Sequence, residues 1–210
     1  MKSLYKNEQS GRSMVEMLGV LAIIGVLSIG GISGYSKAMA KYRVNKTLDQ
    51  ISMLVINIRT LFSSSINYDG LSAANAINLG IIPGDMQNGT GSAVKITNSY
   101  QGDVLLGNPG TDDNAKRRFY IVYTGLNSEA CVSLATADWG SQAGSGLEAI
   151  SVQPGDATGP SAVCTKSAPQ NKGDTGCFVI GDNIPISLAD AVNTCSSSTT
   201  DKFSITWFYY

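Results

Sequence analysis

The longest run of apolar residues lies close to the beginning of the chain. Residues 14–32 read MVEMLGVLAIIGVLSIGGI and contain a single charged side chain, that of Glu16. At about 1.5 Å per residue, a helix of this length spans roughly 28 Å, which is close to the ~30 Å hydrocarbon core of a bilayer. The pattern therefore predicts a membrane-spanning helix.

Apolar positions continue at helical spacing after this run. They recur at steps of three and four residues and form one stripe: Leu48, Ile51, Val55, Ile58 and Phe62, widened by Leu54 and Leu61. Three serines at 63–65 end the pattern. We therefore expect one helix from Met14 to Phe62, roughly 74 Å long, whose second half docks on a globular head. The stripe covers about two heptads, which is too short for a long coiled coil.

The remaining periodic segments are short and of both kinds, which predicts an α+β head. Helices are expected at Ser72–Leu79, at Ser128–Ala137 with Ser128 as its N-cap, and at Ser187–Cys195. Strands are expected where β-branched and aromatic residues gather: Val94–Thr97, Val104–Leu106, Arg118–Thr124, Ile150–Val152, Phe178–Ile180 and Phe203–Tyr210. Residues 85–117 are otherwise expected to be rich in loops.

Composition narrows the functional classes. The 210 residues are enough for one domain of ordinary size. Charged residues make up 15%, against a usual ~25%, and the net charge is −1. The chain has no excess of positive charge that would attract nucleic acid, so no nucleic-acid partner is expected. Polar small residues are abundant after residue 63, as is typical of an exported surface.

Candidate catalytic and metal-binding chemistry is sparse. The chain has no His, which excludes His-based triads and imidazole metal sites. No P-loop and no G-x-S-x-G motif occurs. Asp112-Asp113 fits a solvated turn better than a cation site, Arg117-Arg118 fits a strand flank, and the aromatic residues 207–210 fit a sheet core or subunit interface better than a sugar platform. We expect no enzyme activity, no metal and no cofactor.

Four cysteines occur, all in the C-terminal half of the chain: Cys131, Cys164, Cys177 and Cys195. They contain no C-x-x-C pair, so a zinc ribbon or a thioredoxin-type motif is not expected. Three pairings are possible. We favour Cys131–Cys195 with Cys164–Cys177 nested inside it; four buried free thiols are the alternative, which fits an oxidising compartment less well.

The residues on either side of the apolar run do not by themselves decide its orientation, or whether it is a cleaved signal or a membrane anchor. Basic residues stand on both sides, so charge alone does not orient the segment, but the polar, Cys-containing remainder suggests that the C-terminal part lies outside and the N-terminus in the cytoplasm. A cleaved secretory signal ending at Ala38-Met39-Ala40 is one alternative, although the run exceeds the usual ~7–15 residues. A plain membrane anchor is another, but it leaves Glu16 unexplained.

Gly11 stands five residues before Glu16, in G-R-S-M-V-E, between a short basic leader and the apolar run. This arrangement resembles the class III signal of type IV pilins and pseudopilins. The resemblance implies that a prepilin peptidase cuts after Gly11 and methylates the new N-terminus, here Arg12, where the family usually has an apolar residue. It also implies that Glu16 neutralises the terminal amine of a neighbouring subunit and sets the axial register.

The globular part carries a second resemblance. The segments YTGLNSEACVSLAT (123–136), AANAINLGIIPGDM (73–86) and NSYQGDV (98–104) are similar to type IVb pilins of the bundle-forming and plasmid-transfer kind. The resemblance implies an antiparallel sheet packed on the C-terminal half of the long helix. It also implies a disulfide that frames a C-terminal segment exposed on the filament.

Together these patterns predict four parts: a leader (1–11), a transmembrane or filament-core half-helix (12–35), an amphipathic half-helix (36–65) and an α+β head (66–210). The hypothesis is a structural subunit of a type IV pilus, a type IVb-like major pilin. Its implied partners are copies of itself, the prepilin peptidase, an inner-membrane assembly platform and an outer-membrane secretin. It would wait in the inner membrane with a periplasmic head and then join an extracellular pilus. A type II secretion pseudopilin and a minor, tip-located adhesin are the alternatives.

Overall fold

The structure is a computed structural model that describes residues 14–89, 94–110, 112–140, 145–160, 176–197 and 199–210. The chain divides into two compact units, Met1–Lys41 and Tyr42–Tyr210. We call them the N-terminal unit and the C-terminal unit. Gly11, Arg12 and Cys164 lie outside the described residues.

One long helix, α1 (Met14–Leu61), continues through both units. It matches the predicted helix to within one residue at its C-terminal end. In the C-terminal unit most of the predicted stripe is buried: Ile51, Leu54 and Ile58 have no exposed surface. Leu48 and Phe62 are partly buried against the core, whereas Leu61 is exposed, so its inclusion in the stripe was wrong. The residue spacing that predicted a docked face therefore identifies the face that packs on the sheet.

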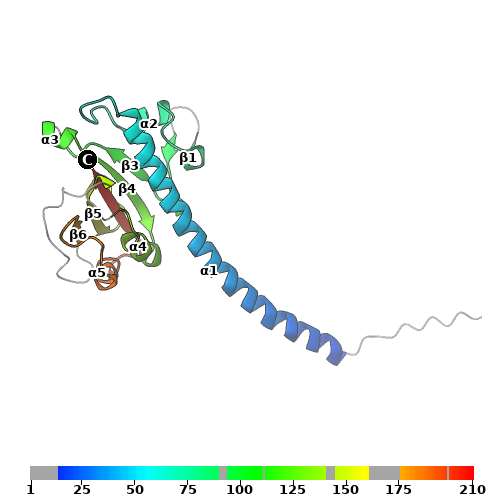
Figure 1. Cartoon of the computed structure of the whole chain (residues 1–210). Helices are drawn as coiled ribbons and strands as arrows, with labels where there is room; N and C mark the ends of the chain where they lie inside the picture. Colours follow the sequence, from blue (N-terminus) through cyan, green and yellow to red (C-terminus); the bar gives the residue numbers. More distant parts are fainter. Residues whose placement is uncertain (1–13, 90–93, 111, 141–144, 161–175, 198) are drawn as a thin grey trace, which may run out of the picture. The chain divides into compact units, whose positions relative to one another are not determined.

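The C-terminal unit is built around a five-stranded antiparallel sheet with the order β3-β4-β7-β5-β6 (Figure 1). Its strands are β3 (Val104–Gly107), β4 (Phe119–Leu126), β5 (Leu147–Pro154), β6 (Gly176–Val179) and β7 (Phe203–Tyr209). A separate pair, β1 (Gln87–Asn88) and β2 (Lys95–Ile96), forms a second small antiparallel sheet. Strand β7, the last in the chain, lies between β4 and β5.

The main core lies between the sheet and the C-terminal part of α1. Alternate residues of β7, namely Phe203, Ile205, Trp207 and Tyr209, belong to the same buried cluster as the α1 stripe. Trp207 makes edge contacts with the rings of Tyr123 and Trp139, at centroid distances of 5.8 and 5.0 Å. Each fully buried large side chain contributes about 1.5–3 kcal/mol, so this layer fixes α1 on the sheet within the unit.

The shorter helices are α2 (Ala73–Asn78), α3 (Asp113–Lys116), α4 (Ser128–Ala135) and α5 (Leu188–Thr194), with a 3₁₀ turn η1 (Gly84–Met86). The predicted cap of α4 is wrong: Asn127 is the N-cap, and its Oδ1 accepts from the Ala130 amide at 2.9 Å. Both residues suit an N-cap, and the chain turns one residue earlier than expected. Asp112 also has a structural role, since its Oδ1 caps α3 through the Ala115 amide.

Three elements in the region expected to be loops were not predicted: η1, β1 and α3. Each has two to four residues, too few to show a periodic pattern. Strand β5 is also longer than the three residues expected. It extends because it pairs with β7 over its whole length, with a register shift between Leu147 and Ala149.

Candidate functional site

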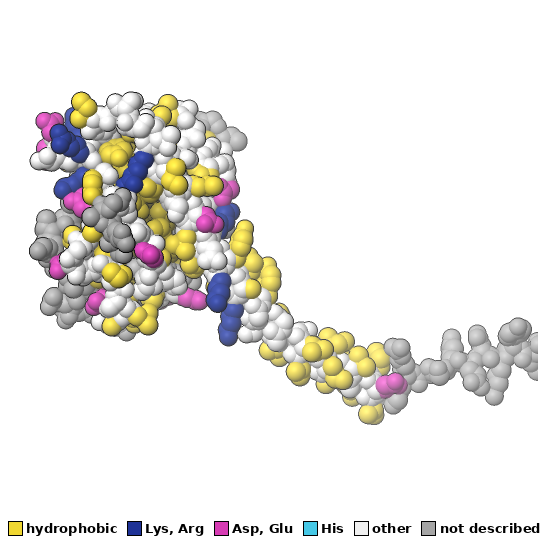
Figure 2. Space-filling model, viewed as in Figure 1, with side chains coloured by type: hydrophobic (Ala, Val, Ile, Leu, Met, Phe, Trp, Pro, Cys, Tyr) yellow, Lys and Arg dark blue, Asp and Glu magenta, His cyan; other side chains and the backbone are white. Residues whose placement is uncertain are grey.

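The N-terminal unit presents an apolar helix surface. Its large apolar side chains are exposed on every side of the helix: Met14, Val15, Met17, Leu18, Val20, Leu21, Ile23, Ile24, Val26, Leu27, Ile29 and Ile32. Figure 2 shows hydrophobic side chains along this part of α1. Among the described residues, α1 is a helix long and apolar enough to cross a membrane. A helix that is apolar all round suits lipid or a bundle of other helices.

Small and polar residues within this surface are compatible with close packing. Ser28 and Ser36 donate their hydroxyl groups to the carbonyls of Ile24 and Ile32, at 2.7 and 3.0 Å, so neither needs an outside partner. A methyl group added at any of the helix glycines would meet no atom within 4 Å: Gly19, Gly25, Gly30, Gly31 and Gly34. These positions leave room for the backbone of another helix to approach.

Glu16 lies in the first turn of α1 as the structure describes it and is exposed. No other acidic residue follows in the sequence until Asp49. The predicted processing residues Gly11 and Arg12 lie outside the described part of the chain, so the structure describes Glu16 without them.

In the C-terminal unit, α1 is tied to the segment that precedes β1. Asp85 accepts a hydrogen bond from Gln50 at 2.9 Å and pairs with Lys46 at 3.1 Å. Asn57 donates to the Ile81 carbonyl at 2.8 Å. Desolvation tends to raise the pKa of Asp85, but hydrogen bonds from Lys46 and Gln50 outweigh it and hold this pKa below its ordinary value. These polar contacts surround the buried stripe and fix the rotation of the helix.

Arg59, in the last turn of α1, connects this helix to the residues just before β5 and just after β7. Its guanidinium donates to the carbonyls of Ser145 and Tyr210, at 2.7 and 3.3 Å, and lies 5.4 Å from the Tyr209 ring centroid. Gly146 makes room for it, because a Cβ there would lie 1.9 Å from Arg59 Nη2. This role of Arg59 cannot be predicted from the sequence, since nothing in its neighbourhood distinguishes it from other surface cations.

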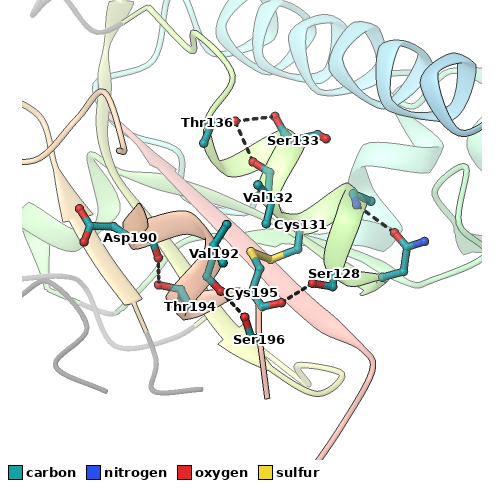
Figure 3. Close-up of a disulfide and its surroundings, with 12 residues drawn as sticks. Ser128, Cys131, Val132, Ser133, Thr136, Asp190, Val192, Thr194, Cys195 and Ser196 are labelled. Carbon is teal, nitrogen blue, oxygen red and sulfur yellow. Dashed lines mark hydrogen bonds between the residues drawn. A yellow bond between two sulfur atoms is a disulfide. The ribbon is translucent and has the colours of Figure 1, made fainter. Parts of the chain in front are cut away.

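A disulfide joins Cys131 of α4 to Cys195, directly after α5 (Figure 3). Both residues are fully buried, and their Cα atoms are 5.7 Å apart. Ser128, the expected cap, instead donates its hydroxyl to the Cys195 carbonyl at 2.6 Å. The bridge and this hydrogen bond hold α4 and α5 together. Cys177 is also disulfide-bonded, but Cys164 lies outside the described residues, so the Cys164–Cys177 pairing stays a prediction.

The segment framed by this disulfide contains β5, β6 and α5, and part of it is at the surface. Leu188 and Val192 stand one helical turn apart on α5 and are exposed. A surface cavity of about 400 Å³ lies beside the bridge, lined by residues that include Asn127, Glu129, Ser197 and Asp201. These side chains can donate and accept hydrogen bonds. Within the described ranges, no group of three or more metal-ligating acidic or Cys side chains comes together.

The terminal aromatic residues have different positions. Trp207 and Phe208 are fully buried, on opposite faces of β7, and Tyr209 is buried beneath Arg59. Desolvation raises the pKa of Tyr209 well above its ordinary value, while Arg59 opposes the rise. Tyr210 remains exposed. Three of the four residues therefore belong to the sheet core. Arg118 flanks β4, as expected, and pairs with Glu148 at 2.7 Å.

The comparison with known sequences identifies the family. The model of the family described as PilS N terminal matches residues 41–207. The chain is 28% identical over 142 residues to the major structural subunit of bundle-forming pilus from Escherichia coli O127:H6, covering 68% of this chain and 72% of that protein. It is 26% identical over 133 residues to the toxin coregulated pilin of Vibrio cholerae, covering 63% of this chain and 59% of that protein.

Solved structures share the fold. The crystal structure of TcpA, a type IV pilin from the Vibrio cholerae El Tor biotype, superposes with a TM-score of 0.57 at 16% identity, covering 80% of this chain and 99% of that one. A type IVb pilin from Salmonella typhi gives a TM-score of 0.51 at 15% identity, covering 78% and 97%. The long helix, the antiparallel sheet and the Cys131–Cys195 bridge agree with the fold expected from the sequence. The chain therefore belongs to the PilS N-terminal family, within the type IVb pilins.

Proposed function

We propose that this protein is a major subunit of a type IV pilus, processed after Gly11 and polymerised through the N-terminal part of α1. The single observation that carries the proposal is the exposed apolar surface of α1 in a chain whose relatives are named as a pilus subunit and a pilin. That apolar surface must be covered in every state of the protein. Lipid covers it before assembly, and the α1 helices of other subunits cover it in the filament.

Glu16 is proposed to act in register selection. A carboxylate that is buried without a partner among apolar helices or lipid chains is destabilising. Pairing with the terminal amine of a neighbouring copy removes that cost, and it does so at one axial offset between subunits. Removal of residues 1–11 creates this amine within five residues of Glu16. The positive charge that processing creates at the new N-terminus is therefore the same charge that Glu16 of a neighbouring copy pairs with during assembly.

The C-terminal unit is proposed to lie in the periplasm before assembly and on the outer surface of the filament afterwards. Its disulfide suits an oxidising compartment. The partners are then a prepilin peptidase, an inner-membrane platform and an outer-membrane secretin, and the role is mechanical rather than catalytic. Relatives named as structural pilus subunits support this reading.

The first test is the N-terminal mass of the protein recovered from sheared cell-surface fibres. We expect an abundant chain that begins at N-methylated Arg12. A chain that begins at Lys41 would contradict the proposal and indicate a secreted protein. An intact Met1 found in membranes alone would indicate an anchored protein.

The location of the protein separates the alternatives. Immunogold labelling confined to fibre tips would indicate a minor pilin, and material confined to the periplasm would indicate a pseudopilin.

The second test replaces the carboxylate. We expect Glu16→Gln to reduce the yield of sheared fibres by at least about tenfold, because the amide cannot neutralise the neighbouring amine, while the amount of membrane-inserted protein stays the same. Asp49→Asn is the matched control, since Asp49 is an exposed acid on the same helix. Equal fibre yields from both variants would remove Glu16 from the assembly mechanism.

A further inference from the structure

Tyrosine and lysine side chains follow directly after the apolar run of α1, all within the N-terminal unit. Tyr35 is 67% exposed, and Lys37 and Lys41 are also exposed. We call Tyr35, Lys37 and Lys41 the basic collar. Figure 2 shows Lys and Arg side chains along α1 after its hydrophobic part. The collar is not explained by the polymerisation proposed above.

The collar is spaced to meet the headgroup layer. Lys37 lies about 7.5 Å along the axis from Ile32, where the apolar run ends, and so falls within the polar layer of about 5–8 Å on each side of a bilayer. Lys41 lies about 13.5 Å from Ile32, beyond that layer, but its long side chain leans toward the helix N-terminus and can reach back to the headgroups. Lys37 and Lys41 are four residues apart and share one side of the helix. Tyrosine is enriched at this depth because its ring is apolar and its hydroxyl is polar.

No protein group neutralises these lysines within the described part of the chain. The ion pairs between described residues involve other cations: Lys46, Lys116, Arg118 and Lys202. The sequence between Glu16 and Asp49 contains no acidic residue, and Arg43 adds a further cation just after the collar. Two exposed lysines beside a membrane span are therefore available to pair with anions from outside the chain.

We propose that the basic collar binds anionic phospholipid headgroups while the protein resides in the bilayer. The inference rests on the membrane-inserted state proposed above and adds a lipid class to it. Continuity with the apolar helix places Lys37 at headgroup level and Lys41 within reach of it through its side chain. The charge of both lysines is complementary to a phosphate without a balancing cation, as in phosphatidylglycerol. A zwitterionic lipid carries its own cation and gains much less from the contact.

The collar also opposes the usual charge bias of membrane proteins. Basic residues favour the cytoplasmic side, yet Lys37, Lys41 and Arg43 follow the span on the side proposed to be periplasmic. Loss of the leader removes Lys2 and Lys6 and sharpens this imbalance. Attraction to anionic headgroups of the outer leaflet offsets it and retains the stored subunit.

The test measures lipid preference directly with the full chain in uncharged detergent micelles. Phosphatidylglycerol or phosphatidylcholine is added in increasing amounts, and the bound lipid is counted by native mass spectrometry. The measurement is made at about 50 and about 500 mM salt, because higher salt screens the attraction between lysine and phosphate. Each lysine near an anionic surface contributes about fivefold, so the wild-type protein should prefer phosphatidylglycerol on the order of 20-fold at low salt.

The decisive comparison is between two double variants of equal charge change. Lys37→Gln with Lys41→Gln should abolish the preference. Lys95→Gln with Lys202→Gln should retain it, because those lysines are exposed in the C-terminal unit. Equal binding of both lipids by the wild-type protein, or a preference that survives loss of Lys37 and Lys41, would overturn the proposal. So would binding of a short DNA oligonucleotide in place of lipid through the same lysines.

This experiment is independent of fibre formation. Loss of lipid preference together with normal fibres would refute the collar alone. Normal lipid preference in a protein that never forms fibres would refute the pilus subunit and leave the collar standing. The two proposals therefore fail in distinguishable ways.

Discussion

Gly102 illustrates how a single residue can be fixed by the backbone around it. Residues 98–102 form a tight turn in which the Asn98 amide donates to the Gly102 carbonyl and the Gly102 amide donates to Asn98 Oδ1, at 2.9 and 3.1 Å. The turn rests on β4, where Asn98 Nδ2 reaches the Thr124 carbonyl at 2.8 Å. A Cβ added at Gly102 would lie 1.8 Å from the Thr124 oxygen. Only a hydrogen atom fits between these two stretches of backbone.

We therefore predict that Gly102→Ala destabilises the protein by about 3 kcal/mol, because backbone rather than a flexible side chain must move. The measurement is urea unfolding of the oxidised protein. Gly84→Ala is the matched control: its added methyl group meets no atom within 4 Å, so its unfolding midpoint should stay close to that of the wild type. Similar midpoints for the two variants would contradict the close approach.

At the residue scale, the Cys131–Cys195 bridge is confirmed; it joins two segments that the sequence predicts as helices. The role of Glu16, which stands out as one charge in an apolar run, stays a prediction. Sequence reasoning failed where a neighbour distant in sequence decides. Gly102 faces Thr124, and Arg59 reaches Tyr210. Neither pair leaves a pattern in the printed sequence.

At the scale of elements, α4 depends on its first turn. Asn127 has an extended backbone conformation and its side chain accepts from the Ala130 amide, while Glu129 adds a favourable charge near the positive end of the helix dipole. The expected cap, Ser128, is also a good capping residue but stands one residue later. Its hydroxyl instead donates to the Cys195 carbonyl, which leaves Asn127 to cap the helix.

Asn127→Ala should destabilise the protein by about 1 kcal/mol, the usual loss for an N-cap. Asn127→Asp is the informative partner, since aspartate caps as well as asparagine and should leave stability nearly unchanged. Both are measured by urea unfolding. A loss in the aspartate variant as large as that in the alanine variant would show that Asn127 acts through its amide nitrogen and not as a cap.

The sequence predicted whole elements well when they were long or strongly periodic. The C-terminal end of α1 and the span of β7 follow from the apolar pattern itself. The extent of β5 does not, because its additional residues become strand only by pairing with β7. Helix α3 is stabilised by its N-cap and strand β1 by its partner strand. Both elements are too short for a periodic pattern to predict them from the sequence.

At the scale of the whole molecule, one covalent bond spans much of the C-terminal unit. The Cys131–Cys195 bridge closes a loop with a sequence separation of 64 and includes two strands of the main sheet. In the chain-entropy model a loop of this length stabilises the folded state by about 4 kcal/mol. The bridge is also fully buried, so it forms part of the core between α4 and α5.

We expect Cys131→Ala with Cys195→Ala to lower the free energy of unfolding by about 4 kcal/mol. The measurement is urea unfolding in a background in which Cys164 and Cys177 are also alanine, so that one bridge alone is tested. Adding reductant to that background with Cys131 and Cys195 intact is the control, because it opens the loop without removing sulfur from the core. A loss below about 1 kcal/mol in both experiments would contradict a stabilising role for the loop.

The central position of β7 governs when this sheet can be completed. Strands β3 and β4 come early in the chain and β5 and β6 later, but the two pairs meet only across Phe203–Tyr209. A polypeptide that emerges with its N-terminus first, from a ribosome or from a translocation pore, can pair β3 with β4 and β5 with β6 before β7 is free, but it cannot join the two pairs. The two halves of the sheet therefore come together in one step, when β7 pairs with both β4 and β5.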